Sequence, residues 1–200
     1  MTTPAWIPMD PRAAEVLDFW FGAQNAPDYG KPRKAWFRKD EAFDAEIRLR
    51  FAATHAAADS GALDSWQHAA PSCLALIIVL DQFSRNMFRG TPRAFASDAR
   101  ALAVAQHAVA RGFDRELSPV QRMFVYLPFE HSERLEDQKR SVELFDTLRG
   151  VPELTDSIPY AQRHYDVIAR FGRFPHRNAI LGRPSTAEEL EYLKQPGTGF

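Results

Sequence analysis

Three short stretches of the sequence place charged or titratable side chains directly beside apolar ones. The first begins at Asp81, where the apolar run Leu74–Leu80 ends. On a helix, Asp81 and Arg85 share one face, because they are four residues apart. A buried charge without a partner is strongly unfavourable. These two residues therefore predict either an internal ion pair or, together with Gln82 and Asn86, the wall of a water-filled pocket that binds a ligand.

The second stretch places His131 between Glu130 and Glu133. Imidazole and carboxylate groups can exchange protons near neutral pH, and both can bind metals. The spacing matches no established metal motif, so we predict no metal site and no cofactor. Instead we assign His131 and Glu133 to catalysis and Glu130 to ligand binding. In the alternative interpretation, Ser132 caps a helix and Glu133 pairs with Arg134 at the surface.

The third stretch carries four arginines and no acidic residue between Val167 and Ala187, and the segment Gln82–Ser97 is also acid-free. Two such segments in a neutral chain predict a local positive field. Arginine forms paired hydrogen bonds with carboxylate or phosphate groups. The residues assigned to this site are a catalytic His176 and the ligand-binding Arg173, Arg177 and Asn178. Alternatively, the arginines pair with Glu130, Glu133 and Asp81 across helix pairs.

One further histidine and two hydroxyl groups complete the candidates. His164 lies on the apolar face of a predicted helix, in register with Tyr160, and is either a core residue or a ligand-binding one. Ser84 and Ser132 lie near the charged stretches, but neither has a visible histidine partner. No nucleophile motif and no glycine-rich phosphate loop occurs in the sequence. Cys73 opens a buried helix, so we predict that its thiol is inert.

The elements that must position these residues read as helices throughout. Helix starts are predicted at or just after Asp10, Asp40, Ser72, Thr91, Ser118, Leu135, Tyr160 and Ser185. The helix around Leu74–Leu80 is apolar on all sides, which predicts that other helices surround it. Pro128 should kink or end the helix that begins after Ser118. About eight helices joined by short loops predict an all-α fold of antiparallel hairpin pairs.

Composition limits the class of protein. The chain has 200 residues and a formal net charge of −1, which argues against a dedicated nucleic-acid binder. The single cysteine excludes a disulfide framework. Residues Met1–Pro11 lack the apolar core of a signal peptide, and Cys73–Leu80 is too short to span a bilayer. We therefore expect a cytoplasmic single domain over residues 1–200, in which residues 183–200 form a short capping helix and tail.

Four segments carry a resemblance to a known family. They are VLDFWFG at Val16–Gly22, LDQFSRN at Leu80–Asn86, HSE at His131–Glu133 and RFGRFPHRN at Arg170–Asn178. In this order they resemble the bacterial Domain of Unknown Function 924 family, over about Ala14–Lys194. The chain departs from the family pattern at Ser84, where proline is usual. The resemblance implies a right-handed helical array of the tetratricopeptide-like superfamily, and it implies no activity.

Three functions remain open on the sequence alone. The mixture of arginine, histidine and carboxylate at helix ends favours a pocket that binds, or acts on, a small anionic molecule. Helical hairpin repeats also form scaffolds that bind a protein partner in a concave groove. The interleaved arginines and aromatics of Arg170–Asn178 leave weak RNA binding as a third hypothesis.

Overall fold

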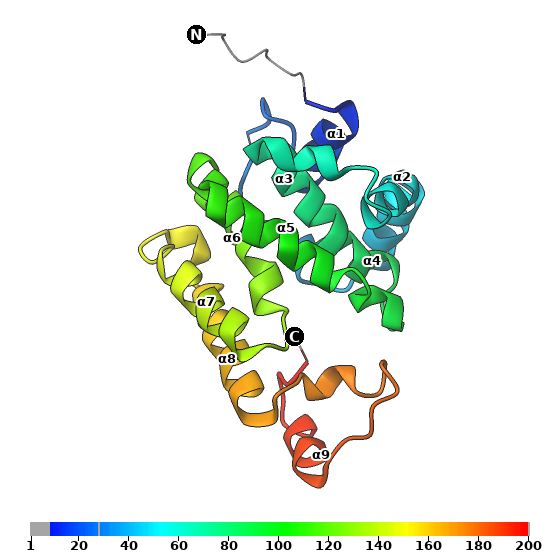
Figure 1. Cartoon of the computed structure of the whole chain (residues 1–200), viewed down its shortest axis with the longest axis vertical. Coiled ribbons are helices and arrows are strands. Elements are labelled where there is room, and N and C mark those ends of the chain that lie inside the picture. The colour runs from blue at the N-terminus through cyan, green and yellow to red at the C-terminus, as the bar shows by residue number, and fades with distance from the viewer. Residues whose placement is uncertain (1–8, 28, 200) are drawn as a thin grey trace.

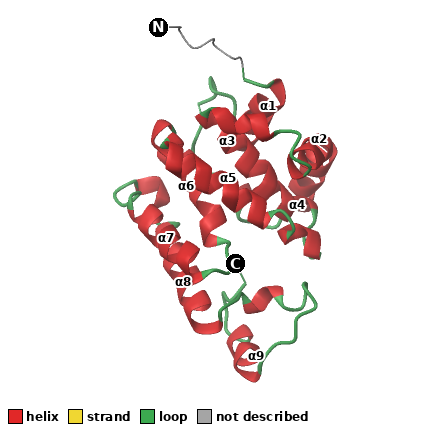
Figure 2. Cartoon of the chain, in the orientation of Figure 1, coloured by secondary structure: helices red, strands yellow, loops and turns green. Residues whose placement is uncertain are grey.

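The computed structural model describes residues 9–27 and 29–199, and these residues contain helices and loops but no strand (Figure 2). Residues 1–8, which make up most of the segment used to exclude a signal peptide, lie outside the described part. Within the described part, no helix combines the length and the apolar character needed to cross a membrane. The predicted all-α class is confirmed.

The helices follow the chain in a simple order. They are α1 (Pro11–Phe21), α2 (Glu41–Asp59), α3 (Ala70–Ile77), α4 (Ser84–Met87), α5 (Asp98–Arg111), α6 (Pro119–Glu130), α7 (Leu135–Asp146), α8 (Ile158–Phe171) and α9 (Ala187–Leu193). A π-helical segment, η3 (Ile78–Phe83), joins α3 to α4. Counted as one unit, α3, η3 and α4 reduce these to the eight helices that the sequence predicts. The right-handed tetratricopeptide-like array stays a prediction.

Several predicted helix ends are confirmed by their caps. The Asp10 carboxylate accepts a hydrogen bond from the Arg12 amide at the start of α1, and Asp40 does the same for α2. Ser118 and Gln121 form a reciprocal capping box before α6. Gly112 ends α5 in the left-handed conformation, which a residue with a side chain rarely adopts.

Other predicted starts are wrong by a few residues. Helix α3 begins at Ala70, so Ser72 lies inside it, and the Ser72 hydroxyl donates to the Trp66 carbonyl at 2.7 Å. Thr91 precedes a single 3-10 turn, and α5 begins only at Asp98. The capping box of α9 is Thr186 with Glu189, one residue later than predicted, because these two side chains satisfy each other's backbone amides.

Helix α6 does not end at Pro128, and α6 and α7 do not form one continuous helix. Helix α6 runs on to Glu130, two residues beyond the proline, and His131 caps it. Proline lacks an amide hydrogen, so the helix loses one backbone bond at this point. Glu133 therefore lies beyond the end of α6, and it does not share a helix face with Glu130.

The core surrounds the central helix, as predicted. Every side chain from Cys73 to Phe83 is buried, and aromatic rings from α1 and α6 pack against it, including Trp20 and Phe124. Trp36 joins this core, whereas its neighbour Phe37 is 61% exposed. Burial raises the pKa of Cys73 to about 12, which keeps the thiol protonated.

A second, smaller apolar cluster forms around Val167, Ile168 and Phe174. It belongs to α8 and the chain that follows it. Figure 1 shows α6, α7 and α8 side by side, with the C-terminal segment and α9 beyond the ends of α4 and α5. Charged side chains lie where the two apolar clusters approach each other, and they contain most of the candidate site.

Candidate functional site

Eight titratable or charged residues form what we call the inner polar cluster. They are Asp81, Arg85, Asp98, Glu130, His131, His164, His176 and Arg177. They come from six elements: η3, α4, the first turn of α5, the end of α6, α8 and the 3-10 turn η7 (Pro175–Arg177). Seven of the eight are residues that the sequence analysis proposed; Asp98 is the exception.

Asp81 and His131 form an acid–base pair. The Nδ1 atom of His131 lies 2.7 Å from Oδ1 of Asp81, and because a carboxylate only accepts, Nδ1 carries the hydrogen. Burial opposes a charge on Asp81, but Arg85 and His131 override it and hold the pKa of Asp81 below its usual range. Burial, reinforced by Arg85, lowers the pKa of His131, so its imidazole is neutral at pH 7.

The backbone that carries this pair is unusual. Asp81 lies in the π-helical segment η3, and both Asp81 and its neighbour Gln82 are buried there. The Gln82 amide donates to the second carboxylate oxygen of Asp81. Short π-helical segments occur frequently at functional sites, where they re-aim side chains at some cost in backbone geometry. The hydrophobic pattern of the sequence does not distinguish such a segment from an ordinary helix.

Asp98 connects two arginines. Its carboxylate accepts two hydrogen bonds from Arg85, at 2.9 and 3.0 Å, and lies 3.3 Å from a terminal nitrogen of Arg177. Arg85 also pairs with Asp81 at 3.2 Å, which confirms the predicted ion pair. The guanidinium of Arg177 stacks on Phe95 and Phe174, with ring centroids at 4.7 and 4.4 Å. Burial, followed by the charge of Arg85, lowers the pKa of Arg177 to about 10.

Glu130 and His164 form a second buried pair in the cluster, in which each side chain is 5% exposed. Nδ1 of His164 donates to the Tyr160 carbonyl at 2.8 Å and lies 3.2 Å from Oε1 of Glu130. Burial, together with the charge of Asp81, raises the pKa of Glu130 to about 8. Burial lowers the pKa of His164 to about 3 and that of His176 to about 4. At pH 7 both histidines are neutral and most Glu130 carboxyls are protonated.

Three predicted site residues belong to a different group, which we call the C-terminal clasp. It consists of Glu133, Arg173, Asn178, Arg183 and Glu189. Arg183 donates to both oxygens of Glu133, at 2.7 and 2.9 Å, and the Phe174 amide donates to the same carboxylate at 2.8 Å. Arg173 holds Glu189 with two bonds, at 2.6 and 2.7 Å. These contacts secure the chain after α8.

Asn86 lies apart from both groups. Its amide donates to Asp44 on α2 at 2.7 Å, and Arg89 holds the same carboxylate with two bonds, at 2.8 and 3.0 Å. An acidic residue 42 positions away in the sequence could not be matched to Asn86 from spacing alone.

The predicted positive field is largely neutralised. Acidic side chains from elsewhere pair with Arg85, Arg89, Arg170, Arg173, Arg177 and Arg183. Two of the three expected carboxylate partners, Asp81 and Glu133, do pair with arginine. Glu130 pairs with His164 instead.

Ser84 has a histidine partner after all. Nε2 of His55 lies 2.7 Å from the Ser84 hydroxyl oxygen, which is also 2.7 Å from the Ser97 hydroxyl. Because the Ser84 hydroxyl donates its only hydrogen to the Leu80 carbonyl, His55 must donate to Ser84 rather than activate it. Ser84 is fully buried, and the group joins α2 to α4 without catalytic geometry.

Solvent reaches the inner polar cluster only through a few partly exposed side chains at its edge. The side chains of His131, Asp98 and Arg85 are 14%, 18% and 20% exposed, whereas Asp81 is 1% exposed. Two surface hollows, of about 330 and 450 Å³, lie elsewhere. The cluster is nevertheless the candidate site, because buried titratable groups with shifted pKa values concentrate at functional sites. In the described ranges, no grouping of His, Cys, Asp and Glu suits a metal ion.

Comparisons with known proteins place the chain in a family of unknown function. Residues 16–197 match the family described as bacterial protein of unknown function (DUF924). A solved structure, of a protein of unknown function named ATU0120 from Agrobacterium tumefaciens, has 43% sequence identity and a TM-score of 0.81 to this chain. That match covers 92% of this chain and 97% of the other. No curated protein matches the sequence. The chain belongs to the DUF924 family of bacterial proteins.

Proposed function

We propose that the inner polar cluster binds a small anionic molecule and moves a proton to or from it. The observation that carries this proposal is the 2.7 Å contact between Asp81 and Nδ1 of His131. That contact fixes the tautomer and leaves Nε2 of the neutral imidazole with its lone pair. Among the described residues, no hydrogen bond involves this nitrogen. His131 is therefore prepared to act as a general base at the accessible edge of the cluster.

Glu130 can act as the proton donor. A carboxyl group with a pKa of about 8 keeps its proton at pH 7 and can donate it. Its Oε2 atom is buried and has no hydrogen-bond partner within the described residues. A neutral base and a neutral acid in one cluster are what proton transfer requires, because each is in the protonation state from which it reacts.

The arginines account for the preference for an anion. Arg85 and Arg177 are balanced by Asp81 and Asp98, so the cluster is close to neutral when Glu130 is protonated. Asp98 is the more exposed of the two carboxylates, and it holds both arginines. A carboxylate or phosphate group that takes the place of Asp98 on Arg85 would keep the charge balance of that pair. Arginine suits this exchange because it binds both groups through two parallel bonds.

A thermal-shift screen tests the proposal. The panel contains phosphate, sulfate, sugar phosphates and dicarboxylates. A ligand at one hundred times its Kd adds about 2.7 kcal/mol to the free energy of unfolding, which raises Tm by roughly 5–10 °C in a domain of this size. We expect at least one anion to stabilise the protein. Silence across the panel would refute the proposal.

Two variants separate binding from chemistry. Arg85→Gln should abolish the shift, while Arg134→Gln, a charge-matched change at an exposed position outside the cluster, should preserve it. His131→Gln should still bind the anion, since it keeps a hydrogen-bond donor toward Asp81, but it should lose turnover of any substrate that the wild type converts. Equal ligand shifts in the wild type and Arg85→Gln would contradict the assignment.

The other functions remain predictions of the sequence. No specific observation in the described residues favours a peptide-binding scaffold or an RNA-binding surface. The pairing of Arg173, Arg177 and Arg183 with carboxylates reduces the charge that RNA binding would use. We keep the cytoplasm as the expected compartment, since the proposed ligand is a small metabolite-like anion.

A further inference from the structure

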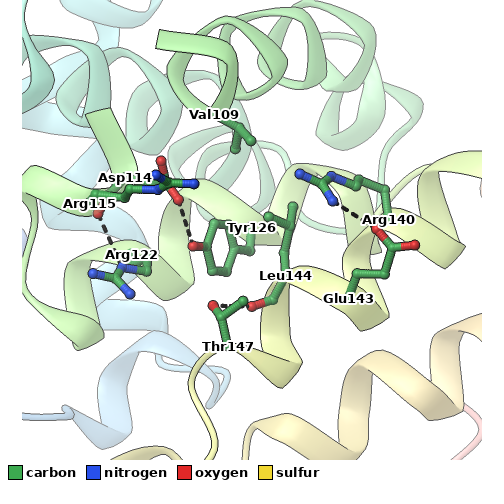
Figure 3. Close-up of a pocket in the computed structure, with 9 residues that line it drawn as sticks. All are labelled: Val109, Asp114, Arg115, Arg122, Tyr126, Arg140, Glu143, Leu144 and Thr147. Carbon is green, nitrogen blue, oxygen red and sulfur yellow. Dashed lines mark hydrogen bonds and ion pairs between the residues drawn. The ribbon is translucent and has the colours of Figure 1, made fainter. Parts of the chain in front are cut away.

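A hollow of about 330 Å³ lies on the side of the molecule where α5, α6 and α7 meet. Its lining includes Arg115, Arg122 and Arg140, and it contains none of the residues of the inner polar cluster. In Figure 3, Arg115 and Arg122 lie on one side of the Tyr126 ring and Arg140 on the other, with Val109 above the ring and Leu144 beside it. This site is independent of the proposed function described above.

The two acidic residues of the hollow each have a partner, although Oδ1 of Asp114 is buried and has no hydrogen-bond partner within the described residues. Asp114 accepts a hydrogen bond from the Tyr126 hydroxyl at 2.8 Å and is buried, and Glu143 pairs with Arg140 at 2.7 Å (Figure 3). Burial and the contact with Asp114 raise the pKa of Tyr126 to about 12, so its hydroxyl stays protonated and continues to donate. Neither carboxylate forms an ion pair with the two remaining arginines.

Those two arginines keep unused hydrogen-bonding capacity. Arg122 donates from Nε to the Asp114 backbone carbonyl at 3.1 Å, which fixes the direction of its guanidinium and leaves both terminal nitrogens available. Arg115 is exposed and has no ion pair within the part of the chain that the structure describes. A concave site with three guanidiniums and two carboxylates has a surplus positive charge, which disfavours a cationic ligand and favours an anionic one.

We propose that this hollow binds a small organic anion, with its oxyanion group on Arg115 and Arg122 and its apolar part against Val109 and Leu144. A bare inorganic ion would leave most of a 330 Å³ space unfilled. A carboxylate or a phosphate ester satisfies the same two guanidiniums, since both present paired oxygen acceptors. The shared chemistry is therefore an oxyanion attached to a compact apolar body.

Isothermal titration calorimetry with the full chain tests this site. The ligands are phenyl phosphate, benzoate and inorganic phosphate. We expect phenyl phosphate or benzoate to bind at least tenfold more tightly than inorganic phosphate, and the tighter of the two identifies the preferred oxyanion. Arg115→Gln should weaken that binding about tenfold or more, which is the effect of losing one charged hydrogen bond.

Two control variants make the result specific. Arg111→Gln removes the same charge from the last turn of α5, where Arg111 lies over the Phe113 ring outside the hollow, and it should bind as the wild type does. Arg85→Gln, in the inner polar cluster, should also leave this binding intact. Absence of binding to both organic anions, or an equal loss in Arg111→Gln, overturns the proposal. A loss confined to Arg85→Gln would place the anion in the inner polar cluster and overturn it as well.

Discussion

Replacing Glu130 with glutamine removes one titrating group from the inner polar cluster while keeping the size of the side chain. In the folded chain, burial and the charge of Asp81 raise the pKa of Glu130 to about 8, against an ordinary value of 4.5. Between these two values, the folded protein holds a proton on Glu130 that the unfolded chain has released. The folded state therefore binds more protons, and stability must fall as pH rises through this window.

The magnitude follows from the same two pKa values. Each pH unit within the window costs about 1.4 kcal/mol, and the loss flattens near pH 8. Below pH 6.5 the buried histidines oppose this trend, because burial lowers the pKa values of His131, His164 and His176 and the unfolded chain then binds the additional protons. Between pH 6.5 and pH 8 these histidines are neutral in the folded protein, while the unfolded chain releases its remaining histidine protons, since the ordinary histidine pKa is 6.5. In that interval the contribution of Glu130 alone falls by about 1.5 kcal/mol, and the histidines offset part of this loss in the wild type and in Glu130→Gln alike.

Urea denaturation at pH 6.5, 7.0, 7.5 and 8.0 measures this loss. The free energy of unfolding of the wild type should fall by about 1.5 kcal/mol relative to that of Glu130→Gln across the series, because the histidine contribution is common to both proteins. Glu136→Gln, at an exposed position on α7, serves as the matched control and should follow the wild-type slope. Parallel lines for the wild type and Glu130→Gln would refute the claim that Glu130 is protonated in the folded protein.

Two further perturbations test how the cluster and the C-terminal clasp are held. Arg85→Met should destabilise the protein by about 3–5 kcal/mol, because it removes an ion-pair partner of the buried Asp81. Arg50→Met, at an exposed ion pair, should cost below about 1 kcal/mol. Similar urea midpoints for the two variants would argue against this. Glu133→Gln should accelerate amide hydrogen exchange across residues 174–190, because Glu133 accepts hydrogen bonds from Arg183 and from the Phe174 amide. Unchanged exchange in these residues would show that the C-terminal clasp does not hold them.

The helices could be predicted because their signals are local. Asp10, Asp40 and Ser118 each act on the backbone within a few residues, and these helix starts are confirmed. The helix starts that were predicted wrongly also have a local cause, since two neighbouring residues can each cap a helix. Thr186 rather than its predecessor caps α9 because Glu189 completes a reciprocal pair. The sequence does not decide such a competition.

The candidate site could be predicted in part. Residues within one helical turn, such as Asp81 and Arg85, were matched correctly because helix geometry brings them together. Asp98 was missed because it directly follows the acid-free segment, and its link to Arg177 spans 79 positions. Arg173 and Asn178 appeared to belong to the site, but their partner Glu189 draws them into the C-terminal clasp. Pairings across helices depend on packing, which the spacing of residues does not encode.

The most direct test of the acid–base assignment is the tautomer of His131, read from the ring nitrogens by long-range ¹H–¹⁵N NMR of imidazole-labelled protein at pH 7. We predict a protonated Nδ1, an unprotonated Nε2, and a change in the Nε2 resonance when the anion that stabilises the protein is added. A hydrogen on Nε2, or an Nε2 resonance that no stabilising anion alters, would contradict the assignment of His131 as the base.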